Sequence, residues 1–97
     1  MIKVNKDAQI QLIQRCADSV YRNIEEKAAE GFNNIEVFFP SSIYRDACDL
    51  LEERFKKEGL NFTWNLVRRA LNPHTGRTSY FATERIDGCV RKVLRLL

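Results

Sequence analysis

The sequence has no long apolar segment. None of its hydrophobic runs approaches the roughly 20 residues that a helix needs to cross a bilayer. The N-terminal stretch MIKVNKDAQIQ has neither the apolar region nor the cleavage pattern of a secretory signal peptide. We therefore expect no contact with a membrane and a cytoplasmic location.

The sequence also lacks the motifs of enzymes and cofactor-binding proteins. It contains no Gly-rich phosphate loop, no HExxH zinc motif, no Gly-flanked nucleophile and no calcium-loop pattern. The only histidine, His74, lies in an expected turn, and Glu84 has no acid–base partner at a known spacing. We therefore predict a protein that is not an enzyme and that holds no cofactor and no metal.

One cluster of acidic residues offers an alternative, a Mg²⁺ site on an expected helix. Its members are Asp46, Asp49, Glu52 and Glu53. Each acid has a basic residue within reach, so a solvated helix face with local ion pairs is the favoured interpretation.

Cysteine is present but forms no recognisable site. Cys16, Cys48 and Cys89 lie far apart in the chain and form no CxxC pair. Each lies beside an apolar stripe, so we expect three reduced, largely buried thiols. A zinc site would need a fourth ligand, and His74 lies away from all three.

The composition is that of one small globular domain covering residues 1–97. Hydrophobic residues make up 44% of the chain and charged residues 30%, with six Phe, three Tyr and one Trp. This apolar content is enough to build one core, which excludes a disordered chain, while the length is too short for two cores.

The N-terminal part predicts two amphipathic helices with a strand between them. Apolar residues recur every three or four positions over residues 5–30 and again over 43–58, as on one face of a helix. Gly31 and Gly59, each followed by a hydrophobic residue, predict where the two helices end. Residues 34–39 (NIEVFF) read as a short strand.

The C-terminal part predicts a β-hairpin followed by a third helix. Residues 61–71 begin with an alternating apolar pattern, 72–77 (NPHTGR) have turn composition, and 78–85 read as the returning strand. Residues 87–97 show an apolar stripe at helical spacing, with Asp87 as its N-cap.

These elements give the order α-β-α-β-β-α, an α/β (α+β) domain with a three-stranded mixed sheet and packed helices. The first two strands are expected to run parallel through a right-handed crossover, and the hairpin adds an antiparallel third. The alternative is a sheet covered on one face only, whose other face is left free to bind a partner.

The charge is unevenly distributed. Residues 1–60 hold nine Lys and Arg against eleven acids, whereas residues 61–97 hold seven Lys and Arg against two acids. Arginine suits bidentate contact with phosphate or carboxylate, and exposed aromatic side chains can stack on bases. The candidate contact residues in this basic segment are Arg68, Arg69, His74, Arg77, Tyr80, Arg85, Arg91, Lys92 and Arg95.

Two partners fit this surface. The first is nucleic acid, whose phosphates the arginines would contact. The second is an acidic protein surface, because arginine and aromatic residues are also enriched at protein hot spots.

Adjacent residues on a strand face opposite ways, so Arg68 and Arg69 can join one patch only if the strand twists or bulges. Wide apolar stripes in so small a domain also leave a homodimer open.

The layout as a whole is similar to that of small orphan proteins carried by phages and prophages. The similarity lies in a first helix, a strand ending in FFPSS, a helix closing on EGL and a basic hairpin. It implies a phage-type inhibitor or adaptor that blocks a larger protein, and it assigns no role to any single residue.

Overall fold

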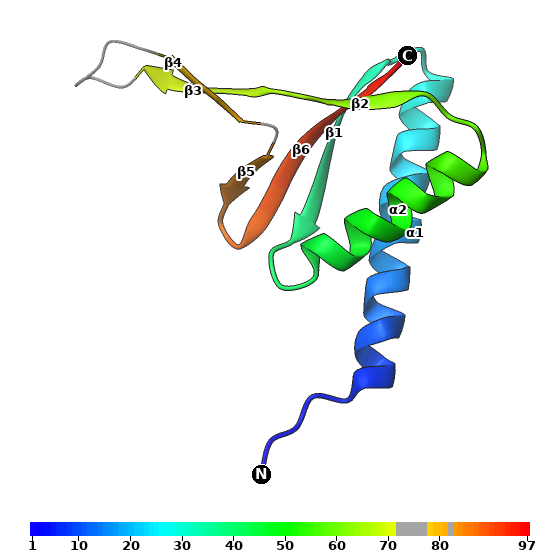
Figure 1. Ribbon diagram of the computed structural model, residues 1–97, viewed down its shortest axis with the longest axis vertical. Coiled ribbons are helices and arrows are strands. Elements are labelled where there is room, and N and C mark those ends of the chain that lie inside the picture. Colours follow the sequence, from blue (N-terminus) through cyan, green and yellow to red (C-terminus); the bar gives the residue numbers. More distant parts are fainter. Residues whose placement is uncertain (72–77, 82) are drawn as a thin grey trace.

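The computed structural model describes the backbone of residues 1–71, 78–81 and 83–97, and the side chains of residues 1–66, 83 and 85–97. The described residues form two helices and six strands (Figure 1). In chain order they are α1 (Lys6–Ala29), β1 (Asn34–Pro40), α2 (Tyr44–Lys57), β2 (Phe62–Asn65), β3 (Val67–Leu71), β4 (Thr78–Phe81), β5 (Thr83–Ile86) and β6 (Cys89–Leu96). Among these residues, no helix combines the length and apolar character that a membrane crossing requires.

The first two of the three predicted helices are confirmed, together with the way they end. The Asn5 side chain caps α1 by accepting a hydrogen bond from the Ala8 amide at 3.1 Å. At the other end, the amide of Phe32 donates to the carbonyl of Lys27, and that of Gly31 to Ala28. This is a Schellman motif, and it needs the left-handed backbone that Gly31 adopts at φ 97°.

The same motif ends α2. The amide of Leu60 donates to the carbonyl of Phe55 at 2.9 Å, and the amide of Gly59 donates to Lys56 at 3.1 Å. Gly59 has φ 70°. A glycine followed by a hydrophobic residue was therefore a reliable signal for both helix ends.

The predicted terminal helix is wrong, because residues 89–96 form strand β6. Val90, Lys92 and Leu94 are buried on one side of this strand, an alternating pattern. A spacing of four, as from Val90 to Leu94, falls on one face of a helix and also on one face of a strand, so the apolar stripe did not distinguish the two.

The signal that distinguishes them is the dipeptide Asp87-Gly88. Both residues have positive φ, 47° and 75°, and they join Ile86 to its ladder partner Cys89. Asp-Gly is favoured in two-residue hairpin turns because both central positions require positive φ. The prediction that Asp87 caps a helix is therefore wrong, because Asp87 lies in the turn of this hairpin.

The sheet has four strands in place of the predicted three, and every pairing in it is antiparallel. Its order is β1-β6-β2, with β5 also paired to β6. The register places Trp64 of β2 beside Leu94 and Arg85 of β5 beside Val90, so β2 and β5 share one side of β6, end to end. β1 and β2 therefore run parallel to each other, as expected, but β6 lies between them.

The predicted hairpin strands are each divided in two by this arrangement. Residues 61–71 supply β2 and β3, and residues 78–85 supply β4 and β5. β2 and β5 both pair with β6, so the chain between them leaves the sheet. There β3 and β4 pair with each other as a two-stranded ribbon. Figure 1 shows this ribbon extending from the sheet on the side away from the helices.

Both helices pack on the same face of the four-stranded sheet (Figure 1). Ile35, Val37 and Phe39 of β1 point into the core beneath them, with exposures of 3% or less. Phe55 of α2 is fully buried, with its ring centroid 5.0 Å from that of Phe62. In the part of the chain that the structure describes, the helices therefore cover one face of the sheet only, which is the alternative that the sequence left open.

Candidate nucleic-acid interface

The ribbon formed by β3 and β4 carries the centre of the predicted contact surface. Its register pairs Arg68 with Tyr80 and Leu71 with Thr78, and the register shifts between these two pairs. Arg69 lies in this irregular stretch. In a regular strand, adjacent residues such as Arg68 and Arg69 face opposite ways. A bulge interrupts this alternation, and a bulge or twist is the condition under which the sequence allows both residues to join one patch.

Two predicted contact residues, His74 and Arg77, lie outside the described residues. They belong to the segment of the chain that connects β3 to β4. The structure therefore describes the two strands on either side of this segment. The contact roles of His74 and Arg77 stay predictions.

Residues 67–81 account for the whole net charge of the protein. They contain three arginines and no aspartate or glutamate, whereas the rest of the chain holds thirteen basic and thirteen acidic residues. Three of the seven basic residues of the segment 61–97 thus lie in 67–81, and the other four share the remainder of that segment with both of its acids. A field of one sign on a projecting element attracts polyanions.

The remaining predicted residues lie on the sheet, not on a helix. Arg85 on β5 and Arg95 on β6 are exposed. Arg91 lies on the face that the helices leave open, where its Nε donates to Glu36 Oε1 of β1 at 3.0 Å. Arg91 is thus partly neutralised by a carboxylate on the neighbouring strand, which reduces its contribution to an anion-binding surface.

Lys92 points to the opposite face and is buried, with 6% of its surface exposed. Its ammonium lies 4.0 Å from the centroid of the Trp64 ring and 5.6 Å from that of Tyr44. The same ammonium donates a hydrogen bond to Cys48 Sγ at 3.4 Å. In this structure Lys92 is a core residue, beyond the reach of a partner that contacts the surface.

Glu52 completes the polar cluster around Lys92. It accepts a hydrogen bond from Trp64 Nε1 at 2.8 Å and a weaker one from the Cys48 thiol at 3.7 Å. This carboxylate therefore holds the Trp64 and Cys48 side chains in place. Among the described residues, no group of three or more His, Cys, Asp or Glu side chains is arranged to hold a metal ion.

Sequence reasoning missed this cluster. Burial raises the pKa of the Cys48 thiol, and the nearby Lys92 ammonium opposes this effect only in part. A thiol with a raised pKa stays protonated at neutral pH and is a poor nucleophile. The chemistry available at this cluster is therefore packing and hydrogen bonding.

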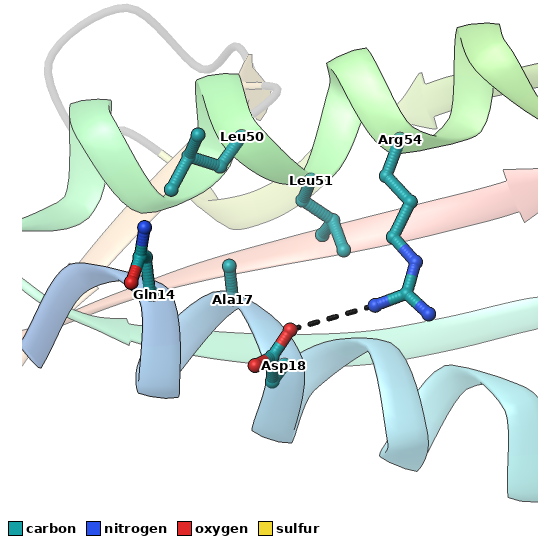
Figure 2. Close-up of a pocket in the computed structure, with 6 residues that line it drawn as sticks. All are labelled: Gln14, Ala17, Asp18, Leu50, Leu51 and Arg54. Atoms are coloured by element: carbon teal, nitrogen blue, oxygen red, sulfur yellow. Dashed lines mark hydrogen bonds and ion pairs between the residues drawn. The ribbon is translucent and has the colours of Figure 1, made fainter. Parts of the chain in front are cut away.

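A separate hollow of about 280 Å³ lies between the two helices (Figure 2). Arg54 of α2 reaches across it to Asp18 of α1, with 3.4 Å between Nη1 and Oδ1. The guanidinium also lies 3.6 Å from the centroid of the Tyr21 ring, and the Tyr21 hydroxyl donates to Glu58 at 2.6 Å. These contacts hold α1 against α2, so the hollow is part of the helix–helix packing.

Fold and surface together define a small α+β protein with a one-sided antiparallel sheet and a projecting basic ribbon. Comparison of the chain with models of known protein families, with curated proteins and with solved structures finds no significant match among any of them.

Proposed function

We propose that this protein binds double-stranded DNA, without catalysis, through the β3–β4 ribbon. The observation that carries the proposal is the coincidence of shape and charge, because the ribbon projects from the sheet and the chain from β3 to β4 holds three arginines and no acid. The major groove of B-form DNA is wide enough to admit a two-stranded β-ribbon. The major groove of double-stranded RNA is too narrow for such an element, which favours DNA.

The residues that we assign to contact are Arg68, Arg69 and Arg77, together with Tyr80 and His74. Arginine binds phosphate bidentately and also reads guanine in the major groove. If each arginine neutralises one phosphate, the logarithm of the affinity should fall against the logarithm of the salt concentration with a slope of about −2.7. A fourfold rise in salt would then weaken binding roughly fortyfold.

The test is fluorescence anisotropy with a labelled duplex, a labelled single strand and a labelled RNA duplex at two salt concentrations. A triple variant, Arg68→Ala with Arg69→Ala and Arg77→Ala, should reduce duplex DNA binding at low salt at least about thirtyfold and flatten the salt dependence. The matched control replaces Arg15, Arg22 and Arg45, three exposed arginines of the helices, with alanine. It makes the same change in net charge and should lower affinity less than about threefold.

Two results would overturn the assignment to the ribbon, and a third would change the ligand. One is the absence of DNA binding at low salt, which would leave the acidic protein partner as the remaining prediction for the ribbon. The other is an equal loss in the two triple variants, which would mean that net charge matters and the ribbon does not. Tighter binding of the single strand or of RNA than of duplex DNA would assign the surface to that ligand instead.

A further inference from the structure

Strand β1 lies at the outer edge of the sheet. Hydrogen bonds from Leu96 N to Asn33 O and from Ser41 N to Gly88 O continue its ladder with β6 beyond both ends. In an antiparallel ladder the residues that bond to the neighbour alternate with residues whose backbone faces away. The backbone N–H and C=O groups of Glu36 and Phe38 therefore face outward, and no described strand pairs with them.

This edge carries few of the features by which proteins protect an open edge. Exposed strand edges are commonly blunted by lysine, proline or a bulge. β1 has a regular register, contains no lysine, and has proline only at its last residue, Pro40. Its composition, NIEVFFP, also favours extended structure.

Exposed apolar surface accompanies the open edge. Phe38 is 51% exposed on the uncovered sheet face, and Phe32, just before the strand, is 54% exposed. Both line a hollow of about 310 Å³ between α1 and β1, together with Asn23 and Lys27 of the helix. A neighbouring strand along β1 would cover this surface.

We propose that the occupant is a second copy of this chain, whose β1 pairs antiparallel with this β1 about a twofold axis at Val37. We choose this register because it sets the outward-facing backbone groups of one copy opposite those of the other and places compatible side chains opposite each other. It overlaps all seven residues of both strands and sets Glu36 of each copy opposite Phe38 of the other, so that both pairs exchange two N–H···O bonds. The two exposed Phe38 rings become diagonal neighbours across the axis.

The neighbouring registers are less favourable. Shifting one way sets Glu36 directly opposite Glu36 of the other copy, and like charges in that position are destabilising. Shifting either way also shortens the overlap of the two strands, so that fewer backbone pairs form. A twofold pairing of identical edges is also closed, so it ends at a dimer and does not extend into a fibre.

The dimer would join two sheets into one continuous sheet. β1 lies at one side of each sheet and β2, which leads into the ribbon, at the other, so the two β2 strands would be five strand spacings apart, about 24 Å. If the proposed function holds, a dimer presents two basic ribbons to one duplex. The pairing itself does not depend on that function and is tested without nucleic acid.

The test is the molar mass of the purified protein, measured by sedimentation equilibrium over a wide range of concentration. Phe38→Lys should raise the dimer dissociation constant at least about thirtyfold, because lysine on an edge blocks pairing. The matched control is Ile86→Lys, which adds the same charge at a 44% exposed position on β5, on the opposite side of the sheet. It should leave the dissociation constant within about threefold of the native value.

A second pair of variants separates the backbone from the side chain. Glu36→Pro removes an N–H that faces away from β6, so the internal ladder is kept while the outer donor is lost. It should weaken the dimer, whereas Glu36→Gln, which keeps this N–H, should not. A protein that is monomeric at every concentration overturns the proposal, as does an equal effect of Phe38→Lys and Ile86→Lys. Failure of DNA binding with an intact dimer would overturn only the proposed function.

Discussion

Lys92 and Cys48 meet inside the core, where the lysine ammonium donates a hydrogen bond to the thiol sulfur at 3.4 Å. The two residues lie on β6 and α2, and both are buried beneath the helices. Among the described residues no carboxylate forms an ion pair with Lys92, so aromatic rings and a thiol are its main neighbours. Lys92, which the sequence predicts as a surface contact residue, is thus part of the core packing.

Replacing Lys92 should therefore separate packing from charge. Lys92→Met keeps most of the side-chain volume and removes a buried charge, so the free energy of unfolding should stay within about 1 kcal/mol of the native value or rise. Lys92→Ala also leaves a cavity and should lower it by about 2–4 kcal/mol. Urea denaturation measures both. A large loss in Lys92→Met would show that the ammonium itself stabilises the fold.

Lys92→Met also tests whether Lys92 takes part in binding duplex DNA. Since Lys92 is buried, Lys92→Met should change affinity for duplex DNA less than about threefold, in contrast to the ribbon arginines. Anisotropy titration under the conditions of the ribbon test measures this. A loss as large as that of the triple ribbon variant would mean that the face beneath the helices opens to the ligand.

The raised pKa of Cys48 predicts a pH dependence of stability. Because the ordinary value is 9.0 and the folded value lies above it, the unfolded chain loses the thiol proton first as the pH rises. The stabilisation is complete below pH 9.0 and is lost as the pH rises through the folded value. The native protein should therefore lose more unfolding free energy between about pH 8 and about pH 10 than Cys48→Ala does. Parallel curves for the two proteins would assign the alkaline loss to other groups.

Neighbouring phenylalanines of β1 test which face of the sheet is covered. Phe39 is fully buried and Phe38 is 51% exposed. Phe39→Ala should lower the free energy of unfolding by about 3–5 kcal/mol through the cavity that it leaves. Phe38→Ala in the monomer should cost less than about 1 kcal/mol. Comparable losses would place both side chains in a core and contradict an open face.

The Asp87-Gly88 turn gives a test of the corrected C-terminal structure. No heavy atom lies within 4 Å of a Cβ added at Gly88, so the cost of Gly88→Ala comes from its φ of 75°. This variant should lose about 1–2 kcal/mol of stability, while Asp87→Asn, which tolerates the same left-handed backbone, should stay near native. If residues 87–97 were a helix, Gly88→Ala would instead be stabilising, because alanine is the better helix former.

Elements whose signals are local can be predicted from the sequence alone. Two helices and their ends follow from a 3.6-residue period and a glycine that adopts positive φ, and both conditions are met within one or two turns of chain. The alternation of Ile35, Val37 and Phe39 likewise marks a strand wherever its partners lie. The charge excess of residues 67–81 is also a property of the sequence alone.

Features that depend on partners distant in the chain follow from the way in which the strands pair. Val90 and Leu94 are four residues apart, which suits either a helix or a strand, and it is pairing with β1, β2 and β5 that makes this segment the central strand. The same pairing divides each hairpin strand in two, so that the ribbon leaves the sheet. It also turns Lys92 inward and Arg91 outward, because successive side chains of a strand point to opposite faces. Of the basic residues predicted for the surface, Lys92 thereby lies in the core, whereas Arg85 and Arg95 stay exposed on the sheet.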